Sequence, residues 1–182
     1  AYEGEKGYHG NPSGLDNTCA TYGTLITFRR DPEGNEIDKL ELEDSVEVVM
    51  ANTGIAVDTK SVVAGVKQRK ESKPDEYEGI FKNYEELYEK GLDALKSGDW
   101  KKVGELMDKN QKLLRDIGVS HEKLEELITI AKENGAYGAK LTGGGAGGYM
   151  VALTPGKELQ EKVANALSER VDIVVKSTIG GK

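Results

Sequence analysis

The sequence predicts an α+β fold in which helices cover one face of an antiparallel sheet. Three observations support this fold class. Strand-like runs occur near the beginning and at the end of the chain. Three helical segments with apolar residues at i, i+4 and i+7 follow one another in the middle. The last third then returns to short strands with one helix among them, as expected where helices pack on a sheet.

The first part of the chain reads as strands and turns followed by a helix. Residues 22–30 (YGTLITFRR) are rich in β-formers, and the turn residues Asp-Pro-Glu-Gly-Asn follow at 31–35. Residues 37–42 alternate imperfectly and fit an edge strand, whereas 46–51 (VEVVMA) predict a more buried strand. A helix is expected over 58–70, with Asp58 as its N-cap.

The middle of the chain predicts three helices, over residues 75–97, 99–117 and 120–134. Each begins at a residue that can cap it, and these N-caps are Asp75, Asp99 and Ser120. Gly98, Gly118 and Gly135 stop them. Asn110 falls on the apolar face of the second helix, and the expectation there is a buried amide with its hydrogen bonds satisfied.

The end of the chain predicts strands over 137–142 and 149–153, joined by the sequence GGGAGG. Pro155 begins a helix to about residue 170, and 171–177 (VDIVVKS) form a last strand. Two strands, a helix and a strand after a helical insertion predict a ferredoxin-like layer.

Composition limits the classes of function. The 182 residues suffice for one domain or two small lobes. Basic residues number 25 and acidic residues 32, so the net charge of -7 argues against nucleic acid or an anionic membrane as a partner. No run approaches the roughly 18 apolar residues of a membrane span. A single cysteine, Cys19, rules out an intrachain disulfide and favours a reducing compartment.

The segment HGNPSGLDN, residues 9–17, is the first candidate site. Ser13 can cap a helix that begins at Gly14, which places Asp16 in the first turn. This pattern is a structural capping box on one interpretation. On the other, the helix N-terminus keeps the Asp16 carboxylate ionised, as a group that takes a proton from a hydroxyl requires.

The segment TGGGAGG, residues 142–148, is the second candidate. It contains G-x-G-x-x-G, but a strand rather than a helix follows, which argues against a dinucleotide-binding turn. No G-K-[ST] follows, so it is not a Walker A loop. A tight hairpin and a loop that closely approaches a ligand both remain open, and so many small residues favour the ligand. Thr59, at a predicted helix start, is either a local cap or a hydroxyl that bonds substrate or Asp16.

Four segments together resemble mevalonate kinases of the GHMP kinase superfamily. They are HGNPSGLDN with TYGTLITFRR, then NTGIAVDTKSVVAGVKQR, LMDKNQKLLRDIGVSHEKLEEL and AKLTGGGAGGYMVAL. They occur in the family's order and cover essentially the whole chain. The resemblance implies that residues 1–70 are the end of the N-terminal lobe and that 71–182 form the C-terminal domain.

The resemblance also implies roles for individual residues. Asp16 corresponds to the catalytic carboxylate, and Thr59 to a hydroxyl near the substrate. Glu5 and Ser13 correspond to Mg²⁺ ligands. Ser13 and the loop glycines Gly143, Gly144, Gly145, Gly147 and Gly148 correspond to the part that binds ATP. Arg29 or Arg30 is expected to pair with the mevalonate carboxylate, as guanidinium groups do.

The implied activity is ATP-dependent phosphorylation of (R)-mevalonate to 5-phosphomevalonate in the cytoplasm. The family's PxGxGLGSS phosphate loop is absent from these residues, and the first residue is Ala1 rather than Met. We therefore expect a fragment that is inactive without an N-terminal half. Two alternatives stay open: another GHMP kinase, such as phosphomevalonate kinase, or a non-catalytic half that binds a partner chain carrying the phosphate loop. A homodimer is also open.

The third motif departs from the family in two places. It reads GGGAGG where GAGGGG is more frequent, and Tyr149 follows where cysteine is common. Both forms keep small residues throughout the loop, so the expected fold is unchanged.

Overall fold

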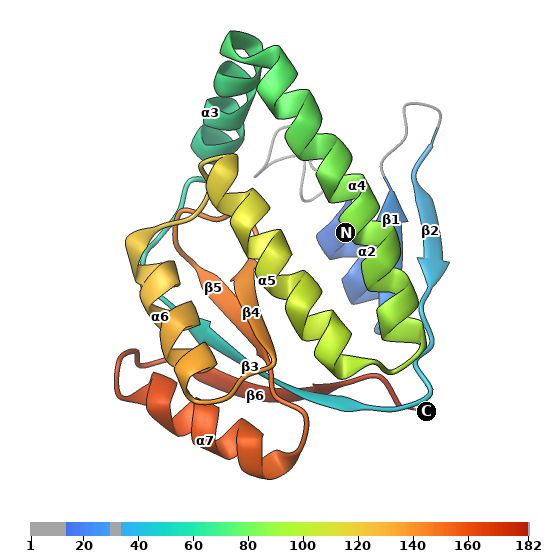
Figure 1. The fold of residues 1–182 in the computed structure, drawn as a ribbon, viewed down its shortest axis with the longest axis vertical. Helices are drawn as coiled ribbons and strands as arrows, with labels where there is room; N and C mark the ends of the chain where they lie inside the picture. Colours follow the sequence, from blue (N-terminus) through green and yellow to red (C-terminus); the bar gives the residue numbers. More distant parts are fainter. Residues whose placement is uncertain (1–13, 30–33, 182) are drawn as a thin grey trace.

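The computed structural model describes residues 14–29 and 34–181, and Figure 1 shows their arrangement. The helices are α2 (Leu15–Tyr22), α3 (Thr59–Ser72), α4 (Pro74–Lys96), α5 (Trp100–Asp116), α6 (Glu122–Glu133) and α7 (Lys157–Ser168). The strands are β1 (Ile26–Arg29), β2 (Glu36–Lys39), β3 (Val46–Asn52), β4 (Gly138–Thr142), β5 (Tyr149–Leu153) and β6 (Val174–Ile179). The predicted α+β class is confirmed.

The central sheet has four antiparallel strands in the order β4-β5-β3-β6, and β1 and β2 form a separate hairpin. Strand β3 lies between strands that follow it by about 100 residues: Val48 pairs with both Leu153 and Ser177. The sheet therefore joins residues from both sides of the boundary predicted at residue 70.

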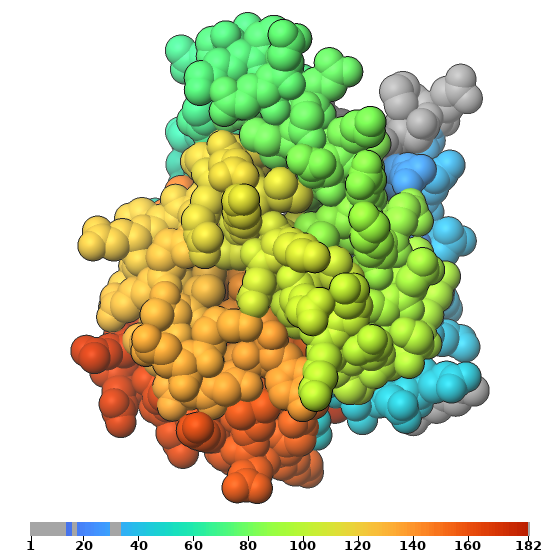
Figure 2. Space-filling model, viewed as in Figure 1, coloured from blue at the N-terminus to red at the C-terminus, as the bar shows by residue number. Residues whose placement is uncertain are grey.

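The two faces of the sheet have different cover, because successive side chains on a strand point to opposite faces. Val49 and Ala51 of β3 face the main core, where buried residues of α6 and α7 pack, such as Leu127 and Val163. Val46 and Val48 point the other way, into a smaller cluster with residues of α4 and α5. In the view of Figure 2, helices α4 to α7 make up most of the visible surface.

Helix α5 covers the free edge of β4. A Cβ on Gly138 would lie 2.2 Å from the carbonyl oxygen of Gly104, so both positions need glycine for the backbones to approach this closely. Further along, the Asp108 carboxylate accepts from Ala139 N at 3.1 Å, and Gln111 Oε1 accepts from Leu141 N at 2.9 Å. These side chains satisfy the outward N–H groups of an edge strand, which would otherwise offer pairing sites to another chain.

Helix boundaries agree with the sequence at some caps and differ at others. Asp58 and Asp99 accept from Lys60 N and Lys102 N, as predicted. The prediction that Ser120 caps α6 is wrong: the N-cap is His121, whose Nδ1 accepts from Lys123 N at 3.0 Å. The Ser120 hydroxyl instead donates to the Glu125 carboxylate.

The first described helix also differs from its prediction. The N-cap of α2 is Gly14, in the left-handed region with φ 84°, and no side chain caps the helix. The helix continues to Tyr22, so the strand expected from residue 22 begins only at Ile26. Within the described residues, no helix combines the length and apolar character needed to cross a bilayer.

Candidate functional site

The glycine loop, residues 142–148, joins β4 to β5 with an unusual backbone. Gly143, Gly145 and Gly148 have φ values of 81°, 79° and 67°, in the left-handed region that favours glycine. Ala146 shares this region at φ 60°, and it is the one residue other than glycine to do so in the described parts of the chain. The loop is therefore a shaped turn and not an extended hairpin tip.

Two other segments hold the loop in place. On one side, Thr53 N donates to Gly148 O at 2.8 Å, and Gly148 N donates to Ile55 O at 3.3 Å. On the other side, Ala146 N donates to the carbonyl oxygen of Val119, in the α5–α6 turn, at 2.7 Å. The loop is thus wedged between residues that precede α3 and residues that precede α6.

The loop also meets Thr59, the first residue of α3. A Cβ built on Gly144 would lie 3.0 Å from Thr59 Cγ2 and 3.2 Å from Thr59 Oγ1. Two candidate residues separated by more than eighty positions in the sequence are therefore brought into contact. The sequence alone did not predict this contact.

A carboxylate already occupies the N-terminus of α3. The Asp58 side chain accepts from Lys60 N at 3.1 Å and from the Ser61 hydroxyl at 2.5 Å. The hydrogen bond from Ser61, and then the one from Lys60 N, lower the pKa of Asp58. The lowered pKa keeps the Asp58 carboxylate ionised at neutral pH, at the helix end where it caps a backbone N–H group.

A cavity of about 420 Å³ lies between α2, the β1–β2 hairpin and the helix pair α4–α5. Its walls are mainly apolar, and Leu15, Asn110 and Lys140 are among the lining residues. Burial lowers the pKa of Lys140 to about 8, and Lys140 Nζ donates to Leu141 O at 2.6 Å. The cavity links the helix that carries Asp16 to the strand that enters the glycine loop.

Asn110 was expected to be a buried, satisfied amide. It lies half-buried at the cavity wall, and the amide that matches the expectation is its neighbour Gln111, which is 1% exposed. Sequence reasoning missed Gln111. A polar residue on the apolar face of a helix was the available signal, and it was applied one position too early.

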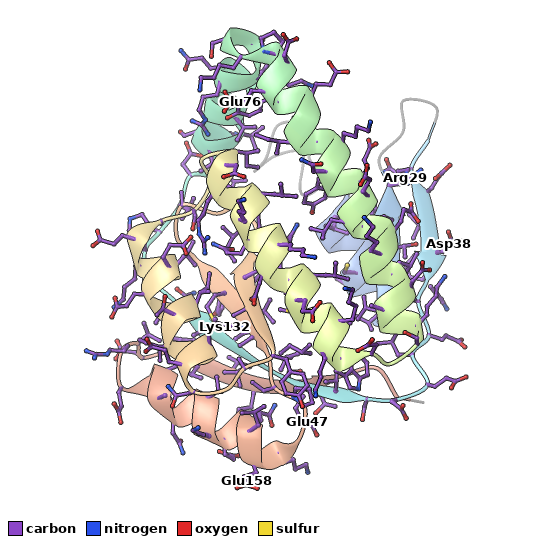
Figure 3. The ribbon with its side chains drawn as sticks, in the orientation of Figure 1. Arg29, Asp38, Glu47, Glu76, Lys132 and Glu158 are labelled. Atoms are coloured by element: carbon purple, nitrogen blue, oxygen red, sulfur yellow. The ribbon has the colours of Figure 1, made fainter. Side chains whose placement is uncertain are left out.

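The remaining candidate residues are placed as follows. Asp16 lies in the first turn of α2, but its side chain is outside the description, as are Glu5, Ser13 and Arg30 altogether. Arg29, labelled in Figure 3, forms an exposed ion pair with Glu89 of α4 at 3.3 Å. Among the residues that the structure describes, no three His, Cys, Asp or Glu side chains cluster as a metal site would require.

Comparison with known proteins shows which proteins have a similar sequence and fold. Residues 92–173 match the family model described as "GHMP kinases C terminal". The crystal structure of L. major mevalonate kinase in complex with R-mevalonate superposes with a TM-score of 0.93 at 34% identity, over 98% of this chain and 56% of that chain. The chain is similar to proteins of the GHMP kinase superfamily, and residues 92–173 match its C-terminal domain.

Curated relatives lead to the same superfamily. The mevalonate kinase of Arabidopsis thaliana is 33% identical over 100% of this chain and 48% of its own length. The mevalonate kinase of Pyrococcus abyssi is 37% identical over 87% of this chain and 47% of its own. The predicted resemblance and the GHMP kinase-like fold are thereby confirmed, and the chain spans about half the length of these relatives.

Proposed function

We propose that this chain is one half of a mevalonate kinase, which transfers the γ-phosphoryl group of ATP to the 5-hydroxyl of (R)-mevalonate. The observation that supports this most is the contact between Gly144 and Thr59, in a fold that superposes closely on a mevalonate kinase. A helix-start hydroxyl beside a loop of small residues can offer a substrate a hydrogen-bonding group.

Asp16 is the proposed catalytic residue. Asp16 belongs to the first turn of α2, and the ionised form of an acidic residue is favoured in the first turn of a helix. An ionised carboxylate can orient the 5-hydroxyl of mevalonate and accept its proton as the oxygen attacks the γ-phosphorus. ADP leaves, and 5-phosphomevalonate is the product.

The other proposed roles concern positioning. Thr59 Oγ1 is a hydrogen-bond donor or acceptor for the substrate beside the loop. The glycines of the loop, with Ser13, form part of the surface that takes ATP. The arginine pair Arg29 and Arg30 is the proposed partner of the mevalonate carboxylate, and the observed Arg29–Glu89 ion pair would then have to exchange for it.

A divalent cation is the expected cofactor of this reaction, because Mg²⁺ neutralises charge on the β- and γ-phosphates. The described residues offer no cluster of acidic or histidine ligands for it. Glu5 and Ser13 are the ligands that the resemblance to mevalonate kinases implies, and their oxygens are of the kind that Mg²⁺ accepts together with phosphates and water.

The division of labour between the two halves is also part of the proposal. Residues 1–70 are assigned to the end of the N-terminal lobe and 71–182 to the C-terminal domain. The Gly/Ser phosphate loop is assigned to the half that this chain does not span, since relatives are about twice as long. The chain alone should accordingly release negligible ADP with mevalonate, and a cytoplasmic location stays a prediction.

The decisive experiment measures ADP release by the chain joined to an N-terminal half that carries a phosphate loop. Mevalonate, phosphomevalonate, homoserine and galactose are compared as acceptors, and mevalonate should give the highest kcat/KM.

In the same joined enzyme, Asp16→Asn should lower kcat by roughly 10²–10⁴-fold with little change in ATP binding, as loss of an acid–base group does. Preference for phosphomevalonate would replace the substrate assignment, and robust turnover by the isolated chain would remove the two-half proposal.

A further inference from the structure

Gln111, on α5, is a buried amide whose two ends bond to different parts of the molecule. Its side chain is 1% exposed. Oε1 accepts from Leu141 N at 2.9 Å, whereas Nε2 donates to Glu125 Oε1 at 2.8 Å and to Ser120 Oγ at 3.1 Å. A polar group buried this deeply is costly unless its bonds are made, so the geometry around it is closely defined.

Two of the three groups that Gln111 bonds, Leu141 N and the Ser120 hydroxyl, lie next to supports of the glycine loop. Leu141 is the penultimate residue of β4, and the loop begins at its neighbour Thr142. Ser120 directly follows Val119, whose carbonyl oxygen accepts from Ala146 N in the middle of the loop. The amide therefore sets the distance between the strand that enters the loop and the turn that supports its centre.

A second set of hydrogen bonds, to the Glu125 carboxylate, stabilises the α5–α6 turn. Glu125 Oε1 receives hydrogen bonds from Arg115 Nε at 2.8 Å and from the Ser120 hydroxyl at 2.5 Å, in addition to the one from Gln111. The glycine loop has almost no freedom to compensate for a shift of this turn, because a Cβ on Gly145 would already lie 2.2 Å from Val119 O.

We infer that Gln111 is a positioning residue for the kinase reaction: through Leu141 and Ser120 it holds the glycine loop against Thr59. This inference rests on the proposed function, since the loop and Thr59 are assigned there to ATP and substrate. Gln111 itself touches neither reactant. Its effect is transmitted by the backbone at both ends of the loop.

The test compares two buried glutamines with matched chemistry. Gln160, on α7, is 7% exposed, and its amide donates to Val48 O and Ser177 O. Among the described residues it makes no hydrogen bond to the loop or to the supports of the loop. Gln111→Met and Gln160→Met each keep the side-chain length and remove buried hydrogen bonds. Both should lower global stability, but only the first should disturb the loop.

Amide hydrogen exchange of the 182-residue chain is the first measurement. The informative probe is Ala146 N, which Gln111 does not contact. We expect its exchange to be at least about tenfold faster in Gln111→Met and unchanged in Gln160→Met after correction for global stability, as expected for local opening. Equal exchange at Ala146 in both variants would overturn the inference.

Kinetics of the enzyme completed with its N-terminal half are the second measurement. Gln111→Met should lower kcat/KM for ATP roughly 10- to 100-fold, a range typical of misplaced reacting groups, whereas Gln160→Met stays within about twofold. Unaltered kinetics despite faster exchange at Ala146 would also overturn the inference.

If Gln111→Met does not fold, Ser120→Ala is the substitute, because it removes one of the two links between Gln111 and the loop. It should show the same effects at smaller size. A completed wild-type enzyme without mevalonate kinase activity would refute the proposed function, whereas the exchange result would still decide whether Gln111 positions the loop.

Discussion

At the scale of single residues, two glycines of the loop differ in why a larger residue would be unfavourable there. Gly143 has φ 81° but nothing within 4 Å of an added Cβ, so alanine there brings only backbone strain. Gly145 has φ 79°, and its added Cβ would lie 2.2 Å from Val119 O, so alanine brings the same strain and a clash with backbone.

Gly143→Ala should therefore destabilise the chain by about 1–2 kcal/mol, the usual cost of a left-handed conformation for a residue with a Cβ. Gly145→Ala should cost clearly more, because Val119 O cannot withdraw without losing its bond to Ala146 N. Urea unfolding of both variants measures the difference. Equal midpoints would show that the α5–α6 turn yields easily and that the loop is less confined than its geometry indicates.

Glu125 gives a prediction on pH. Burial tends to raise its pKa, but hydrogen bonds from Arg115, Ser120 and Gln111 outweigh that effect and lower the pKa below the ordinary value of 4.5. A carboxyl with a lowered pKa in the folded state stabilises the fold above its unfolded pKa, and this contribution is lost as the pH falls through the folded pKa.

Glu125→Gln should consequently lower the melting temperature most at neutral pH, where the wild-type carboxylate is ionised. The gap between variant and wild type should narrow as the pH falls below about 4.5, because a protonated Glu125 resembles glutamine. Thermal unfolding at pH 7, 5, 4 and 3 measures the trend. A gap that is constant with pH would mean that the ionised form is not the one that the three donors stabilise.

Some helix caps and buried side chains could be predicted from the sequence, and others could not. Asp58 and Asp99 cap their helices as predicted, since capping depends on neighbours within three residues. Ser120 does not cap α6, because the carboxylate of Glu125 competes for its hydroxyl. The sequence offered a signal for the burial of Gln111 but none for its partner at Leu141, which lies thirty positions away.

At the scale of elements, the packing of α5 on β4 depends on the absence of two side chains. A Cβ on Gly104 would lie 2.4 Å from the Tyr137 carbonyl oxygen, in a helix interior where alanine would otherwise be favoured. Gly91 in α4 offers a matched control, since nothing lies within 4 Å of its added Cβ.

Gly91→Ala should stabilise the chain by about 0.5–1 kcal/mol through helix propensity alone. Gly104→Ala should have the opposite effect and lower the free energy of unfolding by about 1–3 kcal/mol, as overpacking of a tight contact does. Chemical denaturation of both variants provides the comparison. Stabilisation by Gly104→Ala would show that α5 can move away from the sheet edge at little cost.

The elements themselves could largely be predicted, whereas their partners could not. The strand–loop–strand of residues 137–153 and the three middle helices follow from local periodicity, and the structure has them at nearly the predicted positions. The cover of the β4 edge by Asp108 and Gln111 depends on which N–H groups point outward, and register is set only when the sheet assembles.

At the scale of the whole molecule, the position of β3 decides where the chain can be divided. This strand is the sole partner that β6 has among the described residues, and it also pairs with β5. Its buried residues, such as Val46 and Val49, contribute to the clusters on both faces of the sheet. The β1–β2 hairpin, by contrast, pairs only within itself in the described sheets.

Two truncations follow from this topology. Residues 41–182 keep all four strands of the central sheet and should unfold in one cooperative transition. Residues 71–182 lose β3, which would leave β6 unpaired and remove one wall from each cluster. Because burial of apolar side chains is the main stabilising term in a domain of this size, the shorter piece should lack cooperative unfolding. Circular dichroism during urea unfolding distinguishes the two outcomes. A cooperative transition in 71–182 would place the structural boundary at residue 70. The C-terminal domain would then fold without β3, and β3 would not be part of its core.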